Sequence, residues 1–293
     1  MVNDTAQKMK KVISASRRTD LVAFYPEWLA RAMAKEKACF LHPGKKSAVR
    51  IDLSPARVHT LVLWSKNFHP LLENRHRLRD WLKKYDQVYF HFTITGLGGT
   101  FLEKLAPATT EALAQLPGLI EIAGCPERIS VRFDPIVFWL EDGHLRTNLD
   151  FFPELARKIA SSGIRTVRFS FAQWYKKSVA RAKKIGLNFY DPTYEEKKEA
   201  VQKLVSVAQD FGLELWSCSQ SEIAVLPGIK PSACIDGELL TRLHPRNESA
   251  SLVKDHSQRK DCLCTESIDI GSYSQSCPAA CVYCYANPRL KTE

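Results

Sequence analysis

The stretch FPELARKIASSGIRTVRFSF, residues 152–171, contains one complete helix-to-strand unit. Its first half has the apolar spacing of an amphipathic helix over 153–161, and Gly163 stands where such a helix should end. Its second half, 166–171, is rich in β-branched and aromatic residues and predicts a strand. We therefore expect an α/β protein in which units of this kind repeat.

The same alternation continues on both sides of this stretch. Five further segments have strand patterns, several of them apolar almost throughout, at 12–16, 60–64, 88–95, 129–134 and 213–217. Helical patterns separate them at 26–37, 71–84, 107–116, 175–184 and 194–211. Six strands that alternate with helices predict a parallel sheet covered on both faces. We expect a partial (β/α)6 parallel barrel, with a doubly wound sheet as the alternative.

The alternation ends after residue 217. Residues 219–293 are rich in Cys, Ser, Asp and Gly and predict short helices and loops. We expect residues 1–218 to form the partial barrel. Residues 219–293 would form a Cys-rich, metal-binding extension that folds over the barrel mouth and depends on its metal for structure.

Composition and charge limit the class of protein. The 293 residues are 45% hydrophobic and 25% charged, which excludes disordered, collagen-like and coiled-coil chains. No apolar run approaches the ~20 residues that span a bilayer, and no secretory signal is visible, so we expect a cytoplasmic protein without a membrane partner. The formal charge of +10 favours anionic partners, nucleic acid included, although a basic surface explains it equally well.

Nine cysteines are unevenly distributed along the chain. An odd number without an export signal argues against a disulfide framework and in favour of metal binding. Cys277, Cys281 and Cys284 have the spacing C-x3-C-x2-C, which suits one corner of an iron–sulfur cluster, with zinc or inert thiols as the alternatives. Four more cysteines predict a possible second site for a [4Fe–4S] cluster or zinc: Cys218, Cys234, Cys262 and Cys264. The alternative is that Cys218 and Cys234 are small buried apolar residues.

Polar side chains follow the predicted strands, and the carboxyl ends of parallel strands are where barrel enzymes bind ligands. We assign Arg17, Arg18, Asp20, Arg132 and Asp134 to substrate binding, because guanidinium groups suit an anionic substrate. For Arg132 and Asp134 a structural ion pair is the favoured alternative. No residue is assigned a catalytic role.

The cysteine loop, with Tyr283 before its third cysteine, resembles the cluster loop of radical S-adenosylmethionine enzymes. Further blocks resemble an uncharacterised prokaryotic family known as a domain of unknown function. These blocks are SASRRTD at 14–20, WSKN at 64–67, TITG at 93–96, RFDP at 132–135, QRKDCLC at 258–264, SIDIGSY at 267–273 and CPAACVYCYAN at 277–287.

The resemblance implies a radical enzyme in which a [4Fe–4S] cluster at the three cysteines reductively cleaves S-adenosylmethionine. It also implies an electron donor such as flavodoxin or ferredoxin. The cofactor-binding residues would be Tyr283, which flanks the adenine, together with Lys66, Asn67, Thr95 and Ser170. The alternative is a nucleic-acid-binding protein stabilised by zinc or iron–sulfur, without radical chemistry.

The chain departs from the radical-enzyme pattern in one respect. In that family the cluster loop follows the first barrel strand, whereas here Arg17 and Arg18 stand at that place and the cysteines come last. The Gly-Gly-Glu sequence expected after the second strand is also missing. We therefore expect the tail to fold back and bring its cysteines to the rim that carries Arg17 and Arg18.

Overall fold

A computed structural model describes residues 9–41, 48–272 and 275–286. Tyr273 and Asn287, which end two of the sequence blocks, lie outside the described residues. None of the helices in the described part of the chain has both the length and the apolar character needed to cross a membrane.

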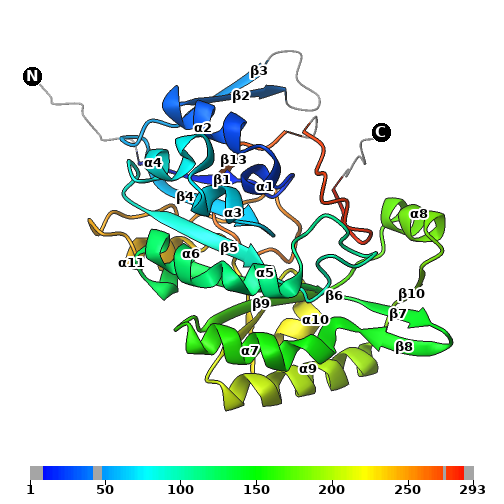
Figure 1. Cartoon of the computed structure of the whole chain (residues 1–293). Helices are drawn as coiled ribbons and strands as arrows, with labels where there is room; N and C mark the ends of the chain where they lie inside the picture. The colour runs from blue at the N-terminus through cyan, green and yellow to red at the C-terminus, as the bar shows by residue number, and fades with distance from the viewer. Residues whose placement is uncertain (1–8, 42–47, 273–274, 287–293) are drawn as a thin grey trace, which may run out of the picture.

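The framework is one parallel sheet of eight strands (Figure 1). All six predicted strands are present: β1 (Lys11–Ala15), β4 (Val58–Ser65), β5 (Val88–Thr93), β6 (Ile129–Ile136), β9 (Thr166–Phe171) and β11 (Glu214–Ser217). The short strands β12 (Ile229–Pro231) and β13 (Ile268–Asp269) come from the tail and occupy the two edges. The sequence did not predict them because two or three residues carry no readable pattern.

The strand order is β12-β11-β9-β6-β5-β4-β1-β13, and every pairing is parallel. From β1 to β12 the order advances in one direction, without the reversal that defines a doubly wound sheet. That alternative is therefore wrong. The expected parallel sheet is confirmed, with eight strands rather than six, and it does not close into a barrel among the described residues.

The helices connect successive strands. They are α1 (Leu21–Phe24), α2 (Pro26–Ala34), α3 (His69–Leu72), α4 (Leu78–Leu82), α5 (Thr109–Ala114), α6 (Leu116–Ala123), α7 (Phe152–Ser161), α8 (Lys176–Lys184), α9 (Tyr194–Asp210), α10 (Ser221–Ala224) and α11 (Gly237–Arg242). The single helix expected over 71–84 is wrong. Asn74, His76 and Arg77 have φ of 55°, 54° and 61°, which interrupts helical geometry and leaves α3, the 3-10 turn Arg75–Arg77 and α4.

Two small antiparallel sheets flank this framework. Strands β2 (Lys37–Leu41) and β3 (Ala48–Asp52) form one, and β10 (Asn188–Tyr190), β7 (Phe138–Glu141) and β8 (His144–Thr147) form the other. The sequence analysis missed both, because these segments fall between the repeating units.

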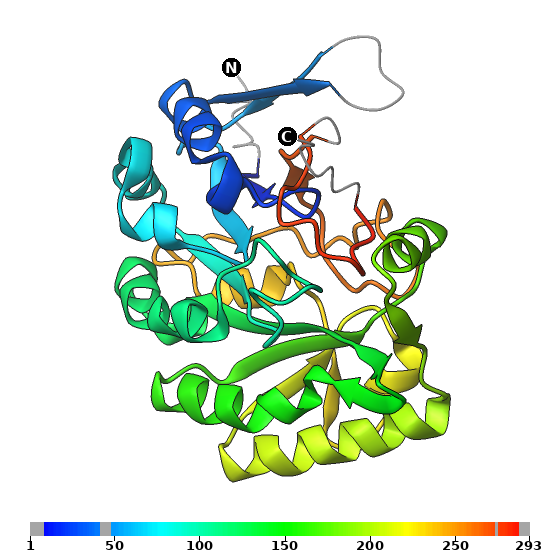
Figure 2. The same ribbon diagram turned by 45° about the vertical axis from the view of Figure 1, so that its right-hand side comes forward.

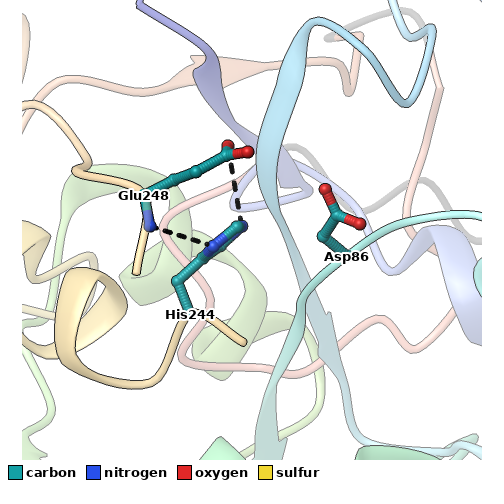
Figure 3. Close-up of side chains that lie close together, drawn as sticks. All are labelled: Asp86, His244 and Glu248. Atoms are coloured by element: carbon teal, nitrogen blue, oxygen red, sulfur yellow. Dashed lines mark hydrogen bonds and ion pairs between the residues drawn. The ribbon is translucent and has the colours of Figure 1, made fainter. Parts of the chain in front are cut away.

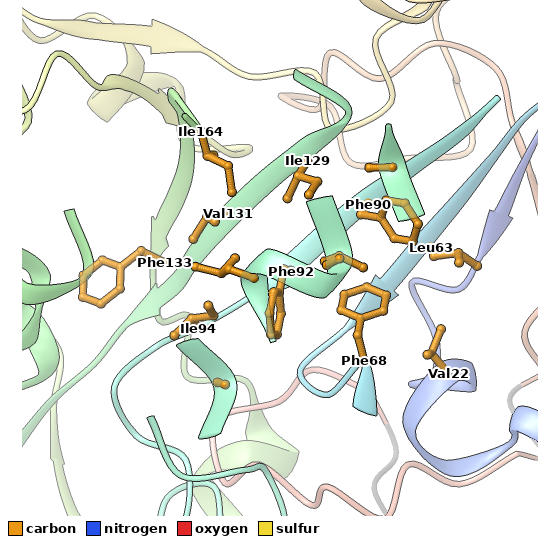
Figure 4. Packing of buried hydrophobic residues seen from close by; sticks show 14 of the residues in the cluster. Val22, Leu63, Phe68, Phe90, Phe92, Ile94, Ile129, Val131, Phe133 and Ile164 are labelled. Carbon is orange, nitrogen blue, oxygen red and sulfur yellow. The ribbon is translucent and has the colours of Figure 1, made fainter. Parts of the chain in front are cut away.

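The two faces of the parallel sheet differ in chemistry, because successive side chains of a strand point to opposite faces. One face is apolar and packs against helices, with Phe68 edge-on to Phe90 and Phe92 at ring distances of 5.5 and 5.1 Å (Figure 4). Alternate positions on the other face hold buried polar groups. These include Ser14, Thr60, His91, Ser130, Arg132 and Arg168. Figure 2 shows the orange and red tail lying across the sheet on the side away from α7 and α9.

Candidate functional site

Strand β13 delivers the cysteine loop to the rim of the sheet. It pairs in parallel with β1, with Ile268 opposite Ile13 and Asp269 opposite Ser14. The Asp269 carboxylate accepts hydrogen bonds from the hydroxyls of Ser14 (2.9 Å) and Ser16 (2.8 Å) and from the N–H of Arg17 (2.8 Å). Because the pairing is parallel, the chain leaves β13 at the same edge where β1 ends, and the cysteine loop follows there.

The loop is fixed to this rim by several contacts. The Tyr285 hydroxyl donates to the carbonyl of Arg17 at 2.7 Å, and the N–H of Val282 donates to the carbonyl of Leu102 at 3.1 Å. Arg181, from α8, donates to the carbonyls of Val282 (3.1 Å) and Cys284. These contacts place residues 282–285 beside Arg17, Leu102 and α8.

Below the loop, three predicted residues converge on one carboxylate that the sequence analysis missed. Glu103 is only 1% exposed and accepts hydrogen bonds from Thr95 (2.6 Å), from Lys66 (3.0 Å) and from the Tyr283 phenol. In the sequence, Glu103 is one acidic residue in the loop after the third predicted strand. No spacing marks it, so only the folded chain reveals its position.

Burial and charge shift the pKa values of this group. Burial by itself lowers the pKa of Lys66, but Glu103, Cys281 and Asp134 together outweigh it, so the pKa of Lys66 lies above its usual value. Burial, and then Glu103, raise the pKa of Cys281 and of Tyr283. Burial, and then Asp20, raise the pKa of Cys277 to about 11. Without a metal the loop thiols are therefore protonated, and metal binding would release their protons.

The spacing of the loop sulfurs bears on which metal fits. The three do not all lie within 4.8 Å of one another; among the described residues, only Asp86, His244 and Glu248 form such a group. Tetrahedral zinc with Zn–S bonds of about 2.3 Å places its sulfur ligands about 3.8 Å apart. Among the described residues, the sulfurs of Cys277, Cys281 and Cys284 therefore do not stand in a preformed zinc geometry.

The four other late cysteines also meet in the structure, on the polar face of the sheet. The sulfurs of Cys218 and Cys234 are 3.4 Å apart, and Cys264 makes hydrogen-bonding contact with both Cys234 and Cys262. The four come from the end of β11, from the segment after β12 and from the tail. They are buried together with Val12, Val62 and Tyr89 of the sheet.

The rim arginines are used in part by the protein itself. Arg18 donates to the carbonyl of Gly271 at 2.8 Å, which helps to hold the tail. Arg17 lies 4.0 Å from Asp255, and its Nη2 atom is buried without a hydrogen-bond partner. Arg132 pairs with Asp134 and also donates to the sulfur of Cys234 at 2.9 Å. The geometry therefore favours a structural ion pair between Arg132 and Asp134 over a role in substrate binding.

Three further predicted residues have local structural partners. Asp20 caps α1 through the N–H of Ala23 (2.9 Å) and accepts from Ser65, and burial raises its pKa to about 6. Asn67 accepts from the N–H of His69 at 3.0 Å, at the start of α3. Ser170 donates to Asp134. Asn67 and Ser170 thus do not join Glu103, unlike Lys66, Thr95 and Tyr283.

The compact group of Asp86, His244 and Glu248 (Figure 3) is an ion-pair cluster by its protonation pattern. The Nδ1 atom of His244 faces the backbone N–H groups of Arg246 and Glu248, so Nδ1 is an acceptor and the proton sits on Nε2. That Nε2 atom is buried without a hydrogen-bond partner, 3.9 Å from Glu248, and Lys10 pairs with both carboxylates. A metal would need a lone pair on Nε2, which this arrangement does not provide.

Two cavities lie in or near the sheet. The one beside Lys66 and Glu103 measures about 10 Å³, which is the size of a single water. A cavity of about 300 Å³ lies beside the start of β5, lined among others by Arg79, Tyr85 and Glu121. It is at the opposite end of β5 from the cysteine rim and is not part of the candidate site.

Comparison with known proteins gives a family but no activity. The family model for "Domain of unknown function (DUF1848)" matches residues 12–286. No curated protein matches the chain. One solved structure with some likeness is the carboxyl transferase domain of Rhizobium etli pyruvate carboxylase with pyruvate. It has 9% identity and a TM-score of 0.26, and the match covers 83% of this chain and 44% of that one. At that score it carries no argument about this fold.

Proposed function

The chain belongs to the family described as Domain of unknown function (DUF1848), and because that description assigns no activity, we propose a function from the site itself. We propose that the protein is a radical S-adenosylmethionine enzyme with a [4Fe–4S] cluster at Cys277, Cys281 and Cys284. Such a cluster, with three cysteine ligands, supplies one electron that cleaves S-adenosylmethionine into methionine and a 5′-deoxyadenosyl radical.

One observation carries this proposal: a parallel edge strand leads directly into the three-cysteine loop at the carboxyl rim of the sheet. The resemblance to radical enzymes implies a loop that follows a first strand. Strand β13 beside β1 provides a strand followed by a cysteine loop, although it comes last in the chain. The one-directional order of the other strands is also that of a barrel, opened at its edges.

The chain's own residues would prepare this site in distinct ways. Lys66, Thr95 and Tyr283 converge on Glu103 and hold the loop over the sheet. Glu103 is a buried carboxylate that could accept a cationic ligand in exchange for Lys66. The cavity that adjoins Lys66 and Glu103 has room only for water, so a nucleoside-sized ligand would require its walls to rearrange.

Access from outside must also be limited, since a 5′-deoxyadenosyl radical reacts with whatever it meets. Ala279, Cys281 and Val282 of the loop pack against Leu97 and Leu102. This apolar contact would exclude water from the reacting atoms. We expect the substrate to be anionic, held near Arg17 and Arg18, and the electron to come from a flavodoxin or ferredoxin.

The test is an anaerobic incubation of reconstituted protein with dithionite and S-adenosylmethionine, with 5′-deoxyadenosine measured by liquid chromatography and mass spectrometry. We expect 5′-deoxyadenosine from the native chain and none from the Cys277→Ala/Cys281→Ala/Cys284→Ala variant. Cys39→Ala is the matched control, because Cys39 is exposed on β2. Bound metal without 5′-deoxyadenosine would favour the nucleic-acid-binding alternative.

A further inference from the structure

The four cysteines on the polar face of the sheet form a group separate from the loop that carries the proposed radical chemistry. We propose that Cys218, Cys234, Cys262 and Cys264 hold a second, closed iron–sulfur cluster that fixes the tail to the sheet.

The donor set is complete and buried. Four cysteine thiolates are the usual ligands of an iron–sulfur cluster that leaves no iron open. Cys218, Cys234, Cys262 and Cys264 are 8, 6, 8 and 2% exposed, so solvent does not compete for the site. The 3.4 Å between the sulfurs of Cys218 and Cys234 is far longer than a disulfide bond of about 2.05 Å, and all four are free thiols in the structure.

The four sulfurs do not stand in the preformed tetrahedron of a single zinc ion. Contacts run in a chain from Cys218 to Cys234, from Cys234 to Cys264 and from Cys264 to Cys262. Yet no three cysteine sulfurs in the described part of the chain all lie within 4.8 Å of one another. Tetrahedral zinc requires every pair of sulfurs to be about 3.8 Å apart. The sulfurs instead form two close pairs, Cys218 with Cys234 and Cys262 with Cys264, and a cluster of several irons can bind one pair at each of two iron atoms.

The buried positive charge around these four cysteines favours an anionic ligand at the site. Arg168, 2% exposed, donates to the hydroxyls of Ser232 (3.2 Å), Tyr89 (3.4 Å) and Ser130 and to the carbonyl of Ala233 (3.2 Å), all of which are neutral. A buried guanidinium without a counter-charge is strongly unfavourable. A four-thiolate cluster is anionic and would supply that charge.

Two more arginines surround the same sulfurs. Arg132 donates to the sulfur of Cys234 at 2.9 Å, and Arg17 lies in the field of Cys234, Cys262 and Cys264. Both guanidinium groups stack on Trp64, at 5.6 Å for Arg17 and 5.2 Å for Arg132. The unpartnered Nη2 atom of Arg17 would find its acceptor in the sulfur atoms of a cluster.

The position of the site gives it a structural consequence. Cys264 comes shortly before β13, and β13 leads into the three-cysteine loop. Cys218 directly follows β11, which lies six positions away from β13 in the sheet. A cluster bound to both would join the tail to the far side of the sheet and offset the entropy of closing so long a loop.

The experiment uses the full chain, reconstituted anaerobically with ferrous iron and sulfide, desalted, and analysed for iron, acid-labile sulfide and zinc. The Cys277→Ala/Cys281→Ala/Cys284→Ala variant isolates the second site. We expect it to retain iron and sulfide in equal amounts and, after reduction, to give an electron paramagnetic resonance signal that does not change on adding S-adenosylmethionine. The Cys262→Ala/Cys264→Ala variant should lose that signal, whereas Cys39→Ala should retain it.

Several outcomes would overturn the second cluster. They are a three-alanine loop variant without iron and sulfide, one with a single zinc per chain, or one that has lost two titratable thiols to a disulfide. If the Cys262→Ala/Cys264→Ala variant fails to fold, the cofactor content of the loop variant decides alone. The result is independent of the proposed function, because the loop variant cannot cleave S-adenosylmethionine whichever metal it holds.

Discussion

The contact between Lys66 and Glu103 allows a quantitative test of how the rim is held together. The Nζ atom of Lys66 lies 3.0 Å from Glu103, and the two side chains are only 16% and 2% exposed. Removing one partner of a buried pair leaves an uncompensated charge, which costs about 3–5 kcal/mol. We therefore expect Glu103→Gln and Lys66→Met each to lower the free energy of unfolding by about 3 kcal/mol, at the lower end of that range.

The double variant should lose less free energy of unfolding than the two single variants lose in sum. With both charges removed, only hydrogen bonds and packing are lost, so we expect a total of about 4 kcal/mol rather than 6, which gives a coupling of about 2 kcal/mol. The assay is urea unfolding of the metal-free chain with linear extrapolation. Thr95→Val is the control, since it removes one hydrogen bond to the charged Glu103 carboxylate but no charge, and it should cost about 1.5–3 kcal/mol. Effects that add within about 0.5 kcal/mol would refute a coupled buried pair.

Three further predictions follow from the contacts described above. Burial lowers the pKa of His59 and of His244, so the unfolded chain binds protons more readily below about pH 6.5. The free energy of unfolding should therefore fall as the pH drops from 6.5 towards 5, and His59→Gln should reduce that slope; equal slopes in urea titrations would contradict this. Asp86→Asn should leave the zinc and iron content of reconstituted protein unchanged, because that group is an ion-pair cluster; a loss of bound metal would show the opposite. A Cβ atom at Gly271 would lie 1.9 Å from the Ser16 hydroxyl, so Gly271→Ala should destabilise the chain by about 1–3 kcal/mol and reduce iron bound at the loop, as measured by urea unfolding and metal analysis.

The repeating units of the fold could be predicted because their signals are local. Most of the six strands are largely buried, and burial selects the apolar, β-branched runs that the sequence displays. The helix over 71–84 could not be divided correctly from sequence. Its break depends on backbone angles at Asn74, His76 and Arg77, and none of these residue types forces a positive φ.

The sequence allowed us to predict which residues could hold a metal or ligand in the candidate site, but not how the fold brings them together. Cysteine spacing identified both sulfur groups, and strand ends identified Lys66 and Thr95. Glu103, however, becomes important only because the loop after β5 folds beneath Tyr283, a contact between residues 180 positions apart. The pairing of β13 with β1 is likewise a contact between residues far apart in the sequence, and a strand of two residues has too little pattern to be predicted.

The position of β13 also affects how the protein behaves when its tail is released. Strand β1 is largely apolar, and β13 covers one of its edges. Without β13, β1 would present a row of unpaired backbone N–H and C=O groups, which is a template for pairing with another chain. Loss of the contacts that hold the tail would therefore appear first as self-association through the β1 edge, before the sheet itself unfolds.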